Sequence, residues 1–580
     1  TLTIEKLTQD SLILKRGELL LKYARNNEAL NQKAIPAAVL TPAKKLLSVR
    51  GELVVGHEVR SFKAEGDSAD YWIVDETGEL MQKYDDMTKG VKNGKPVYVE
   101  LEVIDMGKAD DGFAADYEGV YQVMKINKTL ISLFMLTLLW TSCGASGENI
   151  PAATLPPSEK QDRPTSFAND NEMLDYIQKV HLNYMWDGAE SNSGLAPERI
   201  HLDGIYPQND KDVVTTGGSG FGIAGLLVGI DRGFIDRQEG VKRFRKIVNF
   251  LENADRFHGV WPHWINGKTG RIVPFGRKDD GGDLVESSFL MTSLLCARQY
   301  FKDGNAEEKQ VAASIDKLWK EMEFDWYRRG GQDVLYWHWS PNYGWEMNFP
   351  LEGYNECLIT YILGAASPTH SISADCYHKG WARSGGIKST AKPFGYALEL
   401  KHNGAEQMGG PLFWAQYSYI GLDPRNLSDQ YANYWNVVQN HALSDYEYCV
   451  RNPKGYKGYG KKCWGLTASY SVDGYSAHAP NNDLGVITPT AALSSFPYTP
   501  EQSMNALKYF YAKGAWIWGK YGFYDAFSET KKWTVPRYLA IDQLTIAPMI
   551  ENYRSGLLWK LFMSCPEVQE GLTKLGFTYK

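Results

Sequence analysis

The chain has 580 residues, a formal net charge of −7 and ordinary fractions of hydrophobic (43%) and charged (23%) residues. This composition excludes a mostly disordered chain and a polytopic membrane protein. It also argues against nucleic acid as the main partner, because phosphate neutralisation requires a basic face. The aromatic fraction, 13%, is high, and 16 of the 18 tryptophans lie after residue 166. That excess indicates either a large helical core or a long cleft whose aromatic rings serve as stacking platforms, and composition does not choose between them.

The first 123 residues are predicted to be rich in β-strands. Apolar and polar residues alternate over 51–62, and further strand patterns at 70–74 and 96–103 are bounded by turn-like segments. This spacing predicts a small barrel over 36–123, with residues 1–35 the remnant of a preceding domain. The segments 56–62, 71–75 and 112–119 resemble the C-terminal oligonucleotide-binding-type (OB) barrel of NlpE-like envelope lipoproteins. The metal-associated CxxC motif of that family is absent, because no cysteine precedes Cys143.

Residues 124–143 form a pattern typical of a bacterial lipoprotein signal. A basic start at 124–128 precedes an apolar run, 129–140, that is too short to span a bilayer, and small residues lead to Cys143. Trp140 stands where the usual lipobox has leucine, and a buried helix is the alternative interpretation. Because signals belong at N-termini, we expect Met124 to begin a protein and two reading frames or fragments to be joined here. The sequence leaves open whether residues 1–123 accompany the mature protein.

The remainder of the chain is predicted to be a linker followed by a helical domain. Residues 144–166 hold four prolines among polar residues, as in an extended linker. From 167 to 578, apolar residues recur at helical spacing, for example at Ile223, Leu226, Leu227 and Ile230. About twelve such segments, separated by loops rich in glycine and aromatic residues, favour paired helices closed into a toroid. A helical solenoid is the alternative, although no fixed repeat is visible.

Four carboxylates lie within eight residues where a loop becomes a helix: Asp279, Asp280, Asp283 and Glu286. Asp283 is a candidate N-cap, with Glu286 as its capping-box partner. Capping does not require the flanking glycines or the two additional aspartates. Glycine lets a backbone approach a ligand closely, and clustered carboxylates drive their pKa values apart, as acid–base catalysis requires. Structural and catalytic interpretations both remain open at this point.

Two further regions carry polar side chains in apolar surroundings. Glu356 follows the aromatic loop 337–347 and opens an apolar helix, where it either favours the helix dipole or has a raised pKa and serves as a general acid. The segments 463–469 and 474–483 contain His478, a candidate sugar contact, without a nearby Ser–His–Asp arrangement. Downstream, Asp542 lies in an otherwise apolar helix.

Together with 218–224, 259–264 and 487–492, these segments resemble the glycoamylase-like domain of bacterial envelope proteins, glycoside hydrolase family 144. The resemblance covers residues 167–578. It implies an (α/α)6 toroid, hydrolysis of β-1,2-glucan or sophoro-oligosaccharides with inversion, and no cofactor or metal. Endo- and exo-acting members both occur. We therefore expect a mainly α protein in which the (α/α)6 domain follows a small OB-like β-barrel.

The resemblance also implies roles for individual residues. The acids of the family correspond to Asp279, Asp283 and Glu286 by their spacing, to Glu356 by its Tyr-Asn-Glu context, and to Asp542. We expect Glu356 to be the general acid and the cluster to lie on the base and substrate side, with Asp542 as the alternative base. The candidate substrate contacts are Trp261, Arg277, Trp345, Tyr354, Asn355, Trp414, Trp464, Tyr475 and His478. For each aromatic ring, core packing is the alternative.

Two other functions remain open from the sequence. One is an (α/α)6 hydrolase of another glucan, including an α-linked glucan, and the other is a non-catalytic surface glycan-binding lipoprotein. Several carboxylates favour an enzyme, because binding a neutral sugar does not need them. We expect a periplasmic or cell-surface monomer that binds oligo- or polysaccharide and contacts the membrane only through lipid on Cys143. Endo or exo action, linkage, the identity of the base and any disulfide pairing are left open.

Overall fold

The computed structural model of the protein divides into two units, 1–45 and 46–580. The first unit contains an antiparallel sheet of three strands, β1 (Thr3–Leu7), β2 (Ser11–Arg16) and β3 (Leu19–Ala24). The residues that the structure describes are 3–7, 11–16, 19–24, 46–55, 60–67, 69–75, 77, 79, 80, 83, 84, 87, 96–108, 117–131, 163–206, 210–472 and 474–579.

A closed β-barrel follows. Its strands are joined in the order β4 (Leu46–Val55), β5 (Arg60–Ala64), β6 (Asp70–Asp75), β8 (Gly119–Ile131) and β7 (Val97–Asp105). Every neighbouring pair is antiparallel except β6 with β8. Alternate residues of β7, from Val97 to Val103, are buried, because successive side chains of a strand point to opposite faces. The predicted small barrel is confirmed, whereas its resemblance to NlpE-like lipoproteins stays a prediction.

Strand β8 bears on the predicted signal segment. The strand runs through Met124 to Ile131, so it overlaps the beginning of the segment 124–143. Residues 132–143, with Cys143, and most of the predicted linker, 144–162, lie outside the described residues. The proposed division at residue 124 therefore stays a prediction. Within the described residues, no helix combines the length and hydropathy that a membrane span requires.

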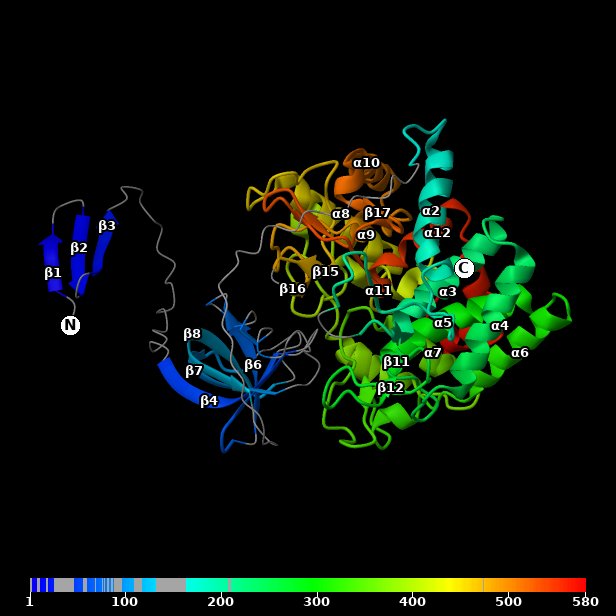
Figure 1. Cartoon of the computed structure of the whole chain (residues 1–580), viewed down its shortest axis with the longest axis horizontal. Coiled ribbons are helices and arrows are strands. Elements are labelled where there is room, and N and C mark those ends of the chain that lie inside the picture. The colour runs from blue at the N-terminus through cyan, green and yellow to red at the C-terminus, as the bar shows by residue number, and fades with distance from the viewer. Residues whose placement is uncertain are drawn as a thin grey trace, which may run out of the picture. The chain divides into compact units, whose positions relative to one another are not determined.

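Residues 163–579 form a mainly helical domain, as predicted (Figure 1). Its described α-helices are α2 (Asp170–Trp186), α3 (Thr216–Asp231), α4 (Arg237–Asn253), α5 (Leu284–Phe301), α6 (Ala306–Lys320), α7 (Leu358–Ala366), α8 (Tyr434–Arg451), α9 (Pro489–Leu493), α10 (Pro500–Ala512), α11 (Ala540–Gln543), α12 (Ile546–Arg554), α13 (Leu557–Met563) and α14 (Pro566–Lys574).

Short strands lie between these helices and pair with one another in small ribbons. They are β9 (Arg199–His201), β10 (Val213–Thr215), β11 (Trp264–Asn266), β12 (Ile272–Val273), β13 (Gly282–Asp283), β14 (His338–Trp339), β15 (Ala468–Ser471), β16 (Gly474–Ala477), β17 (Trp518–Gly519), β18 (Gly522–Phe523), β19 (Phe527–Ser528), β20 (Trp533–Thr534) and β21 (Arg537–Leu539). The barrel and the helical domain have separate hydrophobic cores.

Helices α3 and α5 pack against each other over an extensive interface in the core (Figure 1). Every residue of α3 except Asp231 is buried. A Cβ atom at Gly220 would lie only 2.7 Å from the Cα atom of Leu290, so glycine permits the two backbones to approach. The predicted N-cap of α5 is confirmed, because the Asp283 carboxylate accepts the Glu286 N–H at 2.9 Å. This packing brings the N-terminal turn of α5 to the N-terminal turn of α3.

The six cysteines that the structure describes are all buried and free. They are Cys296, Cys357, Cys376, Cys449, Cys463 and Cys565. The pairing left open by the sequence is thereby answered for this part of the chain: within residues 163–206, 210–472 and 474–579, packing rather than disulfide bonds holds the domain together.

His181 makes the stability of this domain dependent on pH. Its Nδ1 atom donates to the Ile177 carbonyl at 2.8 Å, and its Nε2 atom accepts the Phe523 N–H at 3.3 Å. Protonation of Nε2 would oppose two N–H groups, and burial lowers the pKa of His181 to about 4. An unfolded histidine titrates near about 6.5. Between these values the unfolded chain binds more protons, so the free energy of unfolding falls as pH falls.

We therefore expect His181→Gln to flatten this dependence. Glutamine has a donor and an acceptor but no proton to gain, which removes up to about 1.4 kcal/mol per pH unit from the slope below neutral pH. Urea unfolding at a series of pH values measures the slope. Equal slopes for the wild type and the variant would contradict the role given to His181.

Candidate active site

A two-residue ribbon places the acidic cluster. Strand β13 pairs with β14 so that Asp283 lies opposite His338 and Gly282 lies opposite Trp339. A Cβ atom at Gly282 would lie 2.0 Å from the hydroxyl oxygen of Tyr327, so only glycine fits there. The next residue after β13 begins α5. One short ribbon thus fixes both the N-cap of a core helix and the histidine that faces it.

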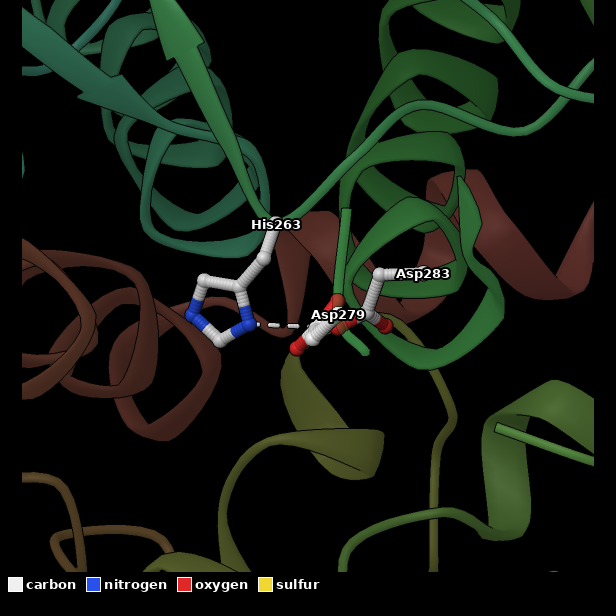
Figure 2. A group of neighbouring side chains, drawn as sticks. All are labelled: His263, Asp279 and Asp283. Carbon is white, nitrogen blue, oxygen red and sulfur yellow. Dashed lines mark hydrogen bonds and ion pairs between the residues drawn. The ribbon is translucent and has the colours of Figure 1, made fainter. Parts of the chain in front are cut away.

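Asp283 and Asp279 share two histidines. The Nδ1 atom of His263 lies 3.1 Å from Asp283 Oδ2, and Figure 2 shows its imidazole directed at the two carboxylates. The Nε2 atom of His338 lies 3.3 Å from Asp279 Oδ2 and 3.6 Å from Asp283 Oδ2. The ring of Phe275 stacks on His263 at 4.1 Å and holds its orientation. The cluster is therefore a buried network of two carboxylates and two imidazoles.

Glu286 does not complete a capping box, which corrects the sequence-based prediction. Its Oε2 atom accepts the N–H of Gly217 at 2.7 Å, in the first turn of α3, whereas the N–H of Asp283 donates to the Trp261 carbonyl. A helix N-terminus presents unpaired N–H groups and favours negative charge. The reason for the difference is therefore tertiary, because the close packing of α3 and α5 offers Glu286 a donor 69 residues away.

The network separates the pKa values of its members. Burial alone would raise the pKa of Asp283, but hydrogen bonds from His263 and His338 hold it well below its usual range. Burial and the Asp283 charge raise the pKa of Asp279, against the opposing effect of His338. Burial raises the pKa of Glu286 to about 8. At neutral pH the site therefore holds an ionised Asp283 beside a protonated Glu286, a division suited to acid–base chemistry.

The two imidazoles complement this charge. Burial disfavours the charged form of His263, but the carboxylates of Glu286, Asp283 and Asp279 outweigh it and raise the pKa of His263 well above its usual value. The pKa of His338 is raised in the same way, with Asp279 and Asp283 outweighing the effect of burial. The raised pKa values favour the protonated form of both imidazoles, in which each ring nitrogen can donate a hydrogen bond to the ionised Asp283.

Glu356 lies close to these acids, although it does not open a helix as predicted. Helix α7 begins at Leu358, so Glu356 precedes it by two residues and is 9% exposed. Besides burial, the charges of Glu356, Asp283 and Glu286 raise the pKa of the Cys357 thiol. Burial and the charges of Asp542, Glu286 and Glu356 likewise raise the pKa of the Tyr417 hydroxyl. Glu286 and Glu356 therefore act on both of these buried side chains, whereas Asp283 acts on Cys357 and Asp542 acts on Tyr417.

Asp542 belongs to a second acidic group. Its Oδ1 atom accepts the hydroxyls of Tyr417 at 3.4 Å and Tyr475 at 3.3 Å. Burial, together with the charge of Asp525, raises the pKa of Asp542 well above its usual value. Tyr417 thus connects this pair with the acids on α5 and before α7.

The candidate sugar contacts occupy different environments. Four side chains are buried, namely those of Trp261, Trp464, Tyr354 and His478. The indole N–H of Trp261 donates to the Leu251 carbonyl, which favours the core-packing alternative for that ring. The side chains that retain some exposure are those of Arg277, Trp345, Asn355, Trp414 and Tyr475. Of these, Tyr475 lies directly against an acid, Asp542.

Several residues of the site were not predicted. They are His263, His338, Tyr417, Asp525 and the ion pair of Arg199 with Asp210, whose Nε and Oδ2 atoms lie 2.7 Å apart. The only available signal was that both histidines sit between large aromatic or proline residues in loops, at 262–264 and 337–339. His263, Asp279 and Asp283 offer ligand atoms within 4.8 Å of one another, the spacing of a metal site. The raised pKa values of the two histidines oppose metal binding, which needs neutral imidazole.

Comparison with known proteins identifies the domain. The family model Glycoamylase matches residues 348–566. The endo-β-1,2-glucanase of Chitinophaga pinensis, solved with sophorotriose and glucose, is 62% identical; the match covers 70% of this chain and 98% of that one, with a TM-score of 0.70. The chain belongs to the glycoamylase-domain family, glycoside hydrolase family 144. Its predicted fold class and its assignment as a glycoside hydrolase are confirmed.

Two further relatives come from Parabacteroides distasonis. An exo-β-1,2-glucooligosaccharide sophorohydrolase acting at the non-reducing end is 46% identical over 427 residues, and the match spans 70% of this chain and 58% of that protein. A β-1,2-glucanase structure from the same organism is 40% identical, with 83% of this chain and 64% of that chain covered and a TM-score of 0.67. The chain thus spans little more than half the length of the curated relative.

Proposed function

We propose that the protein hydrolyses β-1,2-linked glucan or sophoro-oligosaccharides with inversion at the anomeric carbon. The observation that carries the proposal is the set of buried acids with separated pKa values, inside a domain 62% identical to an endo-β-1,2-glucanase. The exo-acting sophorohydrolase among the relatives supports the same substrate class. These relatives include both endo- and exo-acting enzymes, so the products that the protein releases must be identified to distinguish the two modes of action.

In the proposed mechanism, Glu356 protonates the glycosidic oxygen as it leaves. A carboxylate on the opposite face activates water, and an inverting pair requires about 6.5–9.5 Å between the two carboxyls to hold that water. Glu356 lies among buried and aromatic neighbours, an environment that suits an acid. The acidic cluster then belongs to the base and substrate side.

Within the cluster, Asp279 is the better candidate base. Both oxygens of Asp283 are occupied, Oδ1 by the Glu286 N–H and Oδ2 by His263 and His338. Asp283 therefore orients the two imidazoles and supplies fixed negative charge. The raised pKa of Asp279 makes it the stronger base when ionised. Asp542 stays the alternative base.

Incubation of the protein with linear β-1,2-glucan, laminarin and starch tests the proposal. Sugar release from β-1,2-glucan alone is expected, and polarimetry should show inversion. Sophorose as the sole early product would indicate exo action, and a ladder of products would indicate endo action. Release from starch or laminarin instead would favour a hydrolase of another glucan, and release from none of the three would favour a glycan-binding protein.

We also propose that the protein is a monomer held at the bacterial envelope by lipid on Cys143. The pattern at 124–143 supports the anchor. Mass spectrometry of the N-terminus of the protein from its native host, together with its partition into detergent, tests this. An unprocessed N-terminus and a protein that stays in the aqueous phase would contradict it.

A further inference from the structure

The ribbon of β13 and β14 ends beside a proline. Gly282 pairs with Trp339. Two residues further along each antiparallel chain, Asp280 therefore comes opposite Pro341, which has no N–H to donate to a further rung of the ladder. A Cβ atom at Gly281 would lie 2.0 Å from the Trp339 carbonyl oxygen, so the two backbones are still in close contact here. Side chains are needed to join the two chains where the backbone ladder stops.

The side chain of Asp280 makes that connection. Its Oδ1 atom accepts the hydroxyl of Ser340, and its Oδ2 atom accepts the amide N–H of Asn342 at 2.6 Å. The Ser340 oxygen in turn accepts the backbone N–H groups of Asn342 and Tyr343 at 3.1 and 2.8 Å. One donor and two acceptor positions are all that a hydroxyl offers. The loop 340–344, whose two ends pair with each other, is thus fastened to Asp280.

Other contacts between the two loops are weaker. Lys278 Nζ and Glu346 Oε2 are 3.9 Å apart, and the Glu346 side chain is 58% exposed, so this ion pair contributes little. The guanidinium of Arg277 lies over the ring of Tyr343 at 5.4 Å, and Arg277 is exposed as well. The two hydrogen bonds of Asp280 are therefore the main attachment between the loops.

The attachment adjoins the candidate base. Asp279 immediately precedes Asp280, and its Oδ2 atom lies 3.3 Å from Nε2 of His338, on the strand that leads into the attached loop. The Asp279 carbonyl accepts the N–H of Phe275 at 3.0 Å, which closes the loop 275–279 on its own side. The distance between Asp279 and His338 thus depends on the attachment of the loops as well as on the ribbon.

We propose that Asp280 is a positioning residue whose two hydrogen bonds hold the loop 340–344 against the loop 275–281 and so keep His338 against Asp279. No bond to substrate is assigned to Asp280 itself. The effect on turnover rests on the proposed function, in which Asp279 is the base, whereas the attachment of the loops does not. The charge of Asp280 also raises the pKa of Asp279, so the test has to separate this charge from the hydrogen bonds.

Four variants make this separation. Asp280→Ala removes both bonds and should lower kcat about tenfold with KM changed much less, because the base acts on water rather than on bound sugar. Asp280→Asn removes the charge but keeps both bonds once the Asn342 amide turns over, and should retain wild-type kcat. Asn342→Asp places two carboxylates face to face and should lower kcat as Asp280→Ala does. Combining Asp280→Asn with Asn342→Asp supplies a donor to the new carboxylate and should restore kcat.

Glu346→Gln is the matched control. It removes a carboxylate from the same region of the chain, where the contact with Lys278 is long and exposed, and should retain wild-type kcat. Equal losses in Asp280→Ala and Asp280→Asn would assign the effect to charge and overturn the proposal. Wild-type kcat in Asp280→Ala, a loss confined to KM, or no rescue in the double variant would overturn it too.

Hydrogen exchange followed by mass spectrometry tests the attachment without substrate. In Asp280→Ala and Asn342→Asp, peptides covering 336–346 should exchange their amide hydrogens faster than in the wild type, whereas peptides from α8 should not change. The double variant should exchange as the wild type does. Unchanged exchange in Asp280→Ala would reject the attachment. A wild type that releases no sugar from any glucan would instead count against the proposed function, while exchange still tests the loops.

Discussion

Replacing Glu356 with glutamine is expected to lower kcat/KM for β-1,2-glucan by about 10²–10⁴-fold, the usual contribution of a general acid. Glutamine has nearly the same shape but has no acidic proton for the leaving oxygen. The backbone should keep its position, because the Glu356 carbonyl accepts the hydroxyl of Ser418 and the following helix is fully buried. Initial rates of sugar release over a range of substrate concentrations measure the loss.

Two comparisons make this result specific. Glu352 lies four residues earlier in the same segment, but its side chain is exposed and faces Arg383 at 3.8 Å. Glu352→Gln should therefore retain wild-type turnover. An aryl sophoroside, whose phenolate leaves without protonation, should lose much less rate in Glu356→Gln than the glucan does. Near-normal glucan turnover in that variant would remove Glu356 from the mechanism.

Gly217→Ala is expected to lower activity without a residue of the acidic cluster being changed. A Cβ atom at position 217 would lie 2.3 Å from Oε2 and 2.8 Å from Cδ of Glu286, far inside van der Waals contact. The Glu286 carboxyl must then leave the Gly217 N–H that it now contacts at 2.7 Å. Loss of a buried hydrogen bond of this kind costs about 1–3 kcal/mol, so kcat/KM should fall by about one order of magnitude.

Gly225→Ala in the same helix is the matched control. A Cβ atom there would meet only the Leu182 side chain, at 3.5 Å, which is ordinary contact. Alanine also favours a helix by up to about 1 kcal/mol relative to glycine. This variant should therefore be as active as the wild type and slightly more stable in thermal unfolding. Equal activity for both alanine variants would mean that the position of Glu286 does not matter for turnover.

The features that the sequence predicted correctly are local. The spacing of apolar residues identified the helical domain, strand alternation identified the barrel, and the Asp283 cap of α5 was visible as a loop-to-helix signal. In each case the cause lies within a few residues of its effect, so composition and period are sufficient to recognise it.

The site needed tertiary information. Glu286 looked like the partner of its own N-cap, but a donor 69 residues away was better placed. His338 reaches Asp283 through strand pairing across 55 residues, and Asp525, whose charge raises the pKa of Asp542, is in a loop. Trp261 was a candidate sugar contact because it precedes the cluster in the sequence, but its ring is packed into the core. Nothing in a pattern of residue types distinguishes these cases.

The register in which β13 pairs with β14 determines which side chain faces the aspartates, and so determines the charge of the site. Adjacent residues of a strand face opposite sides, so His338 faces the aspartates while Trp339 packs against His258 and Trp326. A slip of one residue would present an indole, which carries no charge, in place of the imidazole. Asp283 would then lose a donor that keeps it ionised. The protonation pattern of the acids thus depends on a strand pairing only two residues long.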